Sequence, residues 1–205
     1  MFGTKMRLKY SLSTCIILLG QLMEATIIMI TTKRLTIRPI EAKDWIAIKE
    51  IWDDFKKTEF VVYDNFKDTT PESLQPRIAK WAEVTRQGNE HMFFATCLND
   101  EMIGFTSMNI VASSEYEIGY GYTNKSHGHG YAQEVLGAIL EYMKNLGATK
   151  IHAGTALRNV PSVILLKRLG FELIGTEKVS FFKDENGNDI YFEGGNFLKN
   201  LTLDK

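Results

Sequence analysis

The hydrophobic and polar positions of the chain change period several times, and each change marks a predicted element. Apolar and polar residues alternate from Leu35 to Ile40, as in a half-buried strand. From Asp44 to Phe55 the apolar residues fall on one helical stripe, with Asp44 as the expected cap and the two tryptophans of the segment in the core. After a polar connector, Pro71 suits the first turn of a second helix that ends near residue 86.

The rest of the chain is predicted to alternate between strands and helices. The expected elements are strands at 92–98, 102–111, 116–122 and 150–156, helices at 131–146 and from Asn159 or Ser162 to about 169, and a terminal hairpin of 172–183 and 189–197. A strand–helix–strand crossover joins parallel neighbours, so strands 116–122 and 150–156 are expected to be parallel. No linker, repeat or low-complexity run divides this pattern, which indicates one α/β domain with a mixed sheet.

Composition narrows the class of protein. The 205 residues are 44% hydrophobic and 24% charged, which is ordinary for one globular domain with a sizeable core. The 24 basic and 25 acidic residues nearly cancel, so no overall field favours nucleic acid or an anionic membrane surface. Cys15 and Cys97 do not indicate a disulfide framework, so we expect a reducing, cytoplasmic compartment and a buried Cys97.

Residues 1–30 are interpreted as an N-terminal extension to a domain that spans 31–200. Basic residues precede a short apolar stretch at 15–19, a pattern that imitates a signal peptide. Gln21 and Glu24 interrupt that stretch well short of the ~20 apolar residues of a spanning helix. We favour an appended or misassigned start, with a packed extension and a signal or anchor as the alternatives.

A glycine-containing turn stands where a strand-like run gives way to a helix-like one. Its residues are His127, Gly128, His129, Gly130, Tyr131 and Ala132. Glycine removes the Cβ atoms that would keep a bulky anion away, and the first N–H groups of a helix are unpaired and lie at the positive end of its dipole. The turn therefore predicts a phosphate site. A mere helix start is the alternative, and a metal site is not expected, because no carboxylate or cysteine cluster accompanies the histidines.

A second motif follows about thirty residues on, where Asn159 and Ser162 open a helical run that ends in Leu169-Gly170-Phe171. Together with Glu117-Ile118-Gly119-Tyr120 and the turn, it resembles the GNAT superfamily of acyl-CoA-dependent N-acetyltransferases over roughly residues 32–198, most closely the ribosomal-protein-acetyltransferase-like (RimJ/RimL-type) branch. His127, Gly130 and Ala132 match three positions of its diphosphate loop. The resemblance implies a mixed, mostly antiparallel sheet of about six to seven strands with a splayed central parallel pair, flanked by about four helices.

The resemblance also implies a cofactor path. Acetyl-CoA would lie between the strands at 116–122 and 150–156, with its diphosphate on the turn and its pantetheine arm along the backbone of Tyr120, Gly121 and Tyr122. Asn159 matches a position that fixes the cofactor, and Ser162 one near the thioester sulfur. Core packing for the tyrosines and helix capping for Asn159 and Ser162 are the alternatives. The histidines at 127 and 129 replace the usual basic or amide residues, so phosphate binding is expected to be weaker or to depend on pH.

The implied reaction is direct attack by an amine on the thioester. Many relatives carry a tyrosine acid at the position of Leu166, and since leucine cannot donate a proton, Ser162, water or the amine's own proton must serve. Glu117 is the candidate base, although it would face away if Tyr116 and Ile118 face the site. The acceptor is expected to be a protein N-terminus or a small amine, and the chain a monomer or homodimer. A non-catalytic acyl-CoA-binding or sensor module is the alternative, and a nucleotide-binding protein is disfavoured because no Lys-Ser or Lys-Thr follows the glycines.

Overall fold

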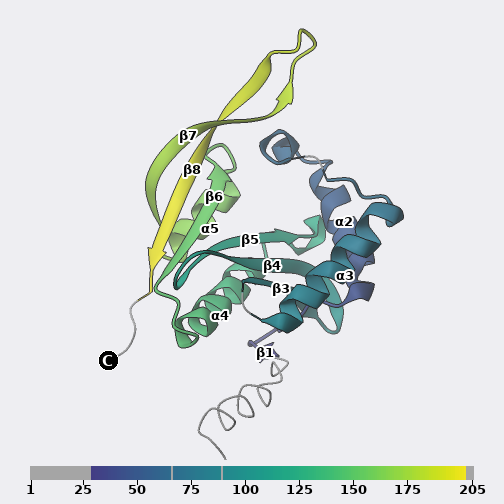
Figure 1. Cartoon of the computed structure of the whole chain (residues 1–205), viewed down its shortest axis with the longest axis vertical. Coiled ribbons are helices and arrows are strands. Elements are labelled where there is room, and N and C mark those ends of the chain that lie inside the picture. Colours follow the sequence, from purple (N-terminus) through teal and green to yellow (C-terminus); the bar gives the residue numbers. More distant parts are fainter. Residues whose placement is uncertain (1–28, 66, 89, 202–205) are drawn as a thin grey trace, which may run out of the picture.

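The computed structural model describes residues 29–65, 67–88 and 90–201 (Figure 1). The strands are β1 (Ile30–Thr31), β2 (Thr36–Pro39), β3 (His91–Leu98), β4 (Glu101–Ala112), β5 (Glu115–Tyr122), β6 (Lys150–Ala156), β7 (Glu172–Lys183) and β8 (Asp189–Asn200). The α-helices are α2 (Trp45–Phe55), α3 (Pro71–Gln87), α4 (Tyr131–Asn145) and α5 (Val160–Arg168), and the 3₁₀ helices are η1 (Ala42–Asp44), η2 (Glu59–Tyr63) and η3 (Asn124–Ser126).

All eight strands belong to one sheet in the order β1-β2-β3-β4-β5-β6-β8-β7. Every neighbouring pair is antiparallel except β5 and β6, which are parallel as the crossover through α4 requires. The predicted single α/β domain with a mostly antiparallel sheet, a parallel pair and four helices is confirmed. The sheet has one strand more than the six to seven expected, because the two-residue β1 pairs with β2.

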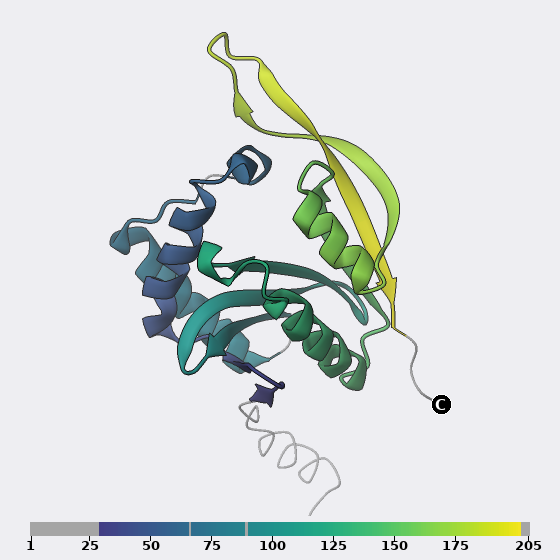
Figure 2. The ribbon, with the colours of Figure 1, turned by 180° about the vertical axis from the view of Figure 1, so that it is seen from behind.

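Two apolar cores form, one on each face of the sheet. The helices that cover the two faces are seen in Figures 1 and 2. Helices α4 and α5 cover one face, where Leu136, Ile139 and Met143 of α4 are fully buried. Helices α2 and α3 cover the other face. There Trp81 stacks on Phe93 and meets the edge of Trp52, so the predicted core role of the tryptophans of α2 is confirmed. Strand residues alternate between these two faces, which decides where each site residue points.

Two details near α2 differ from the sequence prediction. Asp44 occupies the N-cap position, but its carboxylate makes no cap bond. Instead it accepts two 2.8 Å hydrogen bonds from Arg38 and one of 2.7 Å from the backbone N–H of Glu41, because a buried carboxylate is best stabilised by a bidentate guanidinium. The connector after α2 contains the 3₁₀ helix η2, where only a polar loop was expected.

The remaining predictions concern Cys97 and the chain's N-terminal part. Cys97 is buried, as expected, and burial raises the pKa of its thiol. The predicted extension falls almost wholly on residues 1–28, outside the described residues, as does Cys15. Among the described helices, none is both long enough and apolar enough to cross a membrane.

Candidate cofactor and acceptor site

The site begins where β5 and β6 separate. They pair only at three positions, ending at Glu117 opposite His152, whereas β6 stays paired with β8 as far as Ala156. The strands β6, β8 and β7 therefore leave the rest of the sheet as one unit, and their hairpin extends beyond the body of the molecule (Figures 1 and 2). From Ile118 to Tyr122, the edge of β5 that faces β6 pairs with no strand among the described residues. Such an edge can hydrogen-bond an extended ligand that contains amides.

The predicted turn follows β5 and the short η3, and it leads directly into α4. Gly128 and Gly130 have φ of +79° and +76°, a left-handed conformation that glycine adopts without steric cost. A Cβ atom at Gly128 would meet nothing within 4 Å, so the turn is open on that side. Within the described part of the chain, no group accepts a hydrogen bond from the backbone N–H of Gly128, His129 or Gly130. With the first turn of α4, these amides offer unpaired donors of the kind to which anions bind at helix N-termini.

The side chains of the turn are mostly exposed. His127 and His129 are exposed, and the backbone N–H of His127 donates to the carbonyl of Asn124 at 3.1 Å. The ring of His129 stacks on that of Tyr131, with centroids 5.3 Å apart. Ala132 is half-buried in the first turn of α4. The hydrogen-bond donors with fixed positions in this segment are therefore its backbone N–H groups more than its side chains.

Arg34 and Glu134 join the turn to the first strands, a feature that the sequence analysis missed. Arg34 lies between β1 and β2. Its Nη1 donates to the His129 carbonyl at 3.0 Å and its Nε to Oε2 of Glu134 at 2.7 Å. Thr32 donates to the other oxygen of Glu134 at 2.7 Å. Burial opposes the ionisation of Glu134, but these hydrogen bonds outweigh it and lower the pKa of the carboxyl. No sequence signal links residues 100 positions apart.

A pair of hydroxyl groups connects β5 to the start of α5, the helix that follows β6. Tyr120 points to the face of β5 covered by α4 and α5, and its hydroxyl lies 2.8 Å from Oγ of Ser162 in the first turn of α5. Burial raises the pKa of Tyr120, so the phenol stays protonated at neutral pH. The ring packs on the core, as one of the two interpretations predicted, and contact of this residue with a ligand stays a prediction.

The other residues predicted on β5 and α5 lie against neighbouring strands and helices or cap a helix. Tyr122 is on the same face as Tyr120, with a buried hydroxyl beside Thr96 and Thr106, and burial raises its pKa. Gly121 faces α2, where a Cβ would approach a ring carbon of Phe105 to 2.7 Å. Asn159 caps α5, because its side-chain oxygen accepts a 3.4 Å hydrogen bond from the N–H of Ser162. Leu166 is 1% exposed in the core, so no acid acts from that position.

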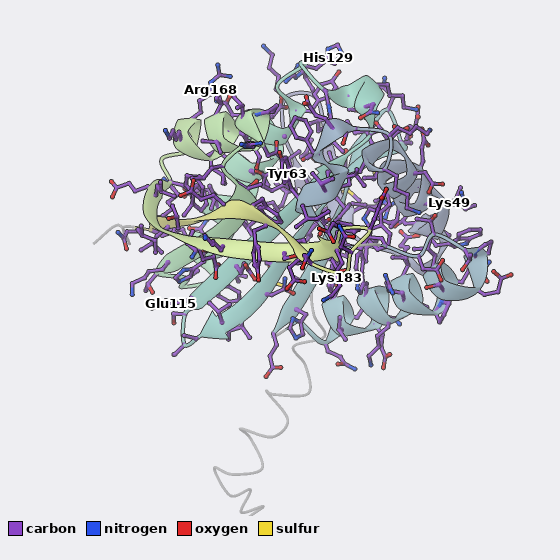
Figure 3. The ribbon with its side chains drawn as sticks, turned by 90° about the horizontal axis from the view of Figure 1, so that it is seen from above. Lys49, Tyr63, Glu115, His129, Arg168 and Lys183 are labelled. Atoms are coloured by element: carbon purple, nitrogen blue, oxygen red, sulfur yellow. The ribbon has the colours of Figure 1, made fainter. Side chains whose placement is uncertain are left out.

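Glu117 lies on the opposite face of β5 from Tyr116, Ile118 and Tyr120, as its place in the strand predicts. Its side chain is exposed and makes no hydrogen bond or ion pair with another described residue. Neighbouring Glu115 is engaged: Lys150 and His152 contact its two oxygens at 2.8 and 2.9 Å, and these bonds lower the pKa of Glu115 (Figure 3). Glu117 is therefore the carboxylate left available beside the point where the strands part.

The face that carries Glu117 is bordered by aromatic residues. Tyr63 of η2 meets the edge of Phe192 on β8 with centroids 5.2 Å apart, and Phe192 lies 5.7 Å from Phe181 of the same hairpin (Figure 3). These contacts join the segment after α2 to the hairpin. Gly154 of β6 is on the same face as Glu117, and a Cβ built there would meet nothing within 4 Å. A second molecule can therefore approach from the side opposite α4 and α5.

Two other features lie apart from this site. A cavity of about 520 Å³ lies between the C-terminal parts of α4, α5 and β8, lined by Lys144, Arg168 and Lys199 among others. It is at the far end of α4 from the turn, so it is not on the predicted cofactor path. In the described ranges, no group of three or more histidine, cysteine or carboxylate side chains is arranged to hold a metal ion.

Comparison with known proteins identifies the family. Residues 34–172 match the family described as an acetyltransferase (GNAT) domain. The uncharacterized N-acetyltransferase YnaD of Bacillus subtilis (strain 168) is 31% identical over 167 residues, which cover 80% of this chain and 94% of that protein.

Solved structures share the fold and include ribosomal-protein acetyltransferases, as the resemblance predicted. The ribosomal-protein-S5-alanine acetyltransferase of Vibrio fischeri has a TM-score of 0.70 at 19% identity, over 84% of this chain and 96% of that one. RimJ of Mycobacterium smegmatis in complex with CoA-disulfide has a TM-score of 0.68 at 17% identity, over 87% and 88% of the two chains. Since the family match extends over most of the described sheet and both predicted motifs, this chain belongs to the GNAT family of acetyltransferases.

Proposed function

We propose that the chain transfers an acetyl group from acetyl-CoA to a primary amine, which is either a protein N-terminus or a small molecule. One observation carries this proposal: the unpaired amides of Gly128, His129 and Gly130 lie at the start of a 15-residue helix, directly beside the gap between β5 and β6. The amides suit a diphosphate and the gap suits the pantetheine arm, so one linear ligand matches both. The solved RimJ complex with CoA-disulfide supports this choice of ligand.

In this proposal the backbone of β5 aligns the donor. The pantetheine amides pair with the free edge at Tyr120, Gly121 and Tyr122, and the thioester comes to lie near the hydroxyl pair of Tyr120 and Ser162. A backbone N–H near Tyr122 is the candidate donor to the oxyanion that forms on the thioester carbonyl. Asn159 holds the first turn of α5 in place through its cap, and thereby fixes the position of Ser162.

The departing thiolate needs a proton, and the hydroxyl pair can deliver it. When the C–S bond breaks, sulfur keeps the electron pair and takes the proton of Ser162. Meanwhile the amide nitrogen loses its second proton, which returns through water to the phenol of Tyr120 as Tyr120, through its hydrogen bond to the serine oxygen, passes its own proton to Ser162. A serine hydroxyl that accepts such a bond is a better donor, because linked hydrogen bonds polarise one another. Tyr120 on β5 and Ser162 at the start of α5 thus supply the proton that Leu166 cannot donate.

The amine would approach on the face that carries Glu117. Helices α4 and α5 fill the opposite face, whereas the face of Glu117 is open at Gly154. Glu117 is the proposed base that removes a proton from the attacking ammonium, directly or through water, since it is exposed and has no partner among the described residues. Tyr63 and Phe192 border the approach and are the proposed acceptor contacts.

The test is release of CoA thiol from acetyl-CoA in the presence of peptides with free N-termini and of small amines, with product identified by mass spectrometry. The proposal predicts acetylated product that disappears for Glu117→Gln at unchanged acetyl-CoA affinity. Tight binding of acetyl-CoA with no product over the whole panel would instead favour the alternative, a non-catalytic acyl-CoA sensor.

The cytoplasmic location of the protein stays a prediction from its sequence.

A further inference from the structure

Arg34 makes five contacts with the turn and with the helix that follows it. Besides the bonds from Nη1 to the His129 carbonyl and from Nε to Glu134, its Nη2 lies 2.7 Å from Oε2 of Glu134, and its backbone N–H donates to Oε1 at 3.0 Å. The guanidinium carbon is 4.6 Å from the ring centroid of Tyr131, which stacks in turn on His129. Arg34, in the loop between β1 and β2, thus contacts His129 in the turn and Tyr131 and Glu134 in the first turn of α4.

The bond to His129 fixes the direction of an amide. The peptide bonds of the described chain are all trans, so the carbonyl of His129 and the N–H of Gly130 point in opposite directions across one plane. Because Arg34 holds that carbonyl, the N–H of Gly130 is held pointing away from Arg34. Gly130 is in a left-handed conformation with its own Cα beside Arg34, where a Cβ would lie 3.7 Å from Nη2. The orientation of this donor depends on a residue outside the turn.

The ion pair removes a charge that would oppose an anion. Glu134 lies in the first turn of α4, and Arg34 contacts both its carboxylate and the carbonyl of His129, so the carboxylate is near the amides that are proposed to bind the diphosphate. Its side chain is only 18% exposed. An unpaired carboxylate there would repel phosphate groups with little screening. Arg34 neutralises it through a fork of two nitrogens, which a lysine cannot reproduce while also reaching the His129 carbonyl.

We infer that Arg34 is a positioning residue for the cofactor's diphosphate: it orients the Gly130 amide and neutralises Glu134 without being part of the glycine motif. This inference rests on the proposed function. Its specific consequence is that loss of Arg34 weakens binding of the diphosphate part of acetyl-CoA and leaves the pantetheine and thioester part unaffected.

The test compares Arg34→Ala and Arg34→Lys with Lys33→Ala. Lys33 is exposed and adjacent, so its loss removes the same charge without touching the turn. Calorimetry is expected to show CoA binding weakened about tenfold to a hundredfold by Arg34→Ala, since charge-assisted bonds are lost. Arg34→Lys should recover part of this loss, and Lys33→Ala should bind as the wild type does. With acetyl-pantetheine, which lacks the diphosphate, kcat/KM should be the same for all four proteins.

A double variant separates electrostatics from folding. In Arg34→Ala/Glu134→Gln the repelling carboxylate is gone, so CoA should bind more tightly than to Arg34→Ala alone, although this variant has lost more of the native contacts. Equal CoA affinity of Arg34→Ala and wild type would overturn the inference and leave the proposed function standing, as would an equal loss with acetyl-pantetheine. Absence of CoA binding to the wild-type chain would overturn both this inference and the proposed function.

Discussion

Gly130 offers the sharpest perturbation of the proposed phosphate site. Its φ of +76° is unfavourable for residues with a Cβ, and asparagine and aspartate are the side chains that tolerate it best. The Cβ itself would meet only Nη2 of Arg34, at an ordinary 3.7 Å. Gly130→Asn and Gly130→Asp therefore have the same shape and the same backbone strain, and differ only in a negative charge placed at the start of α4.

The left-handed backbone lowers the stability of both variants, whereas the added charge lowers the acetyl-CoA affinity of Gly130→Asp alone. The left-handed backbone costs each variant about 1 kcal/mol of unfolding free energy. Two like unit charges about 4 Å apart repel by roughly 4 kcal/mol at an effective dielectric constant of 20. Salt screening and partial neutralisation of the new carboxylate by Arg34 reduce this to about 1–2 kcal/mol. Acetyl-CoA should thus bind roughly five- to thirty-fold more weakly to Gly130→Asp than to Gly130→Asn.

Calorimetric titration with acetyl-CoA measures this difference, and thermal unfolding checks that both variants fold equally well. Gly147 is the matched control, since it has φ of +88° just after α4 and also has open space around its Cβ position. The same two substitutions there should change stability alike and leave the affinity unchanged. Equal acetyl-CoA affinities for Gly130→Asp and Gly130→Asn would refute the assignment of the diphosphate to this turn.

Four further outcomes are expected. Tyr120→Phe should lower kcat about tenfold at unchanged acetyl-CoA Kd, and adding Ser162→Ala should cost little more because the two act as one unit; additive losses in the steady-state kinetics would contradict this. Tyr63→Ala should raise the KM of the amine and not that of acetyl-CoA. Ile139→Ala, at a fully buried position, should lower the unfolding free energy by about 3 kcal/mol in urea titrations. The pKa of Glu134 is lowered by folding, so its contribution to stability is fully present above its unfolded pKa and is lost as the pH falls through its folded pKa. In unfolding titrations, the stability advantage over Glu134→Gln should decline as the pH is lowered beneath the ordinary glutamate pKa of about 4.3.

The features that were predicted well from the sequence are those encoded by residues close together along the chain. The turn was recognised because a strand-like and a helix-like period meet at Gly128 and Gly130. The period of two along β5 also placed Glu117 on the face opposite Tyr120, as the structure has it. The capping of α5 by Asn159 follows from the preference of asparagine for that position.

What the sequence did not predict depends on contacts between distant segments. Arg34 and Glu134 meet only because the sheet brings β1 and β2 beside the start of α4. The hydroxyl of Tyr120 on β5 reaches Ser162 at the start of α5, 42 positions along the chain, which no local pattern encodes. Asp44 was expected to cap its helix, since its type and position favour that role, but the nearby guanidinium of Arg38 offers a stronger partner.

The central claim is that main-chain amides at the start of α4 bind the cofactor's diphosphate. Proton–nitrogen NMR spectra recorded during titration with CoA test it directly, because each backbone amide gives its own signal. The account predicts large downfield shifts for Gly128, Gly130 and Ala132 that are absent on titration with pantetheine. Unchanged signals for these amides under saturating CoA would contradict it.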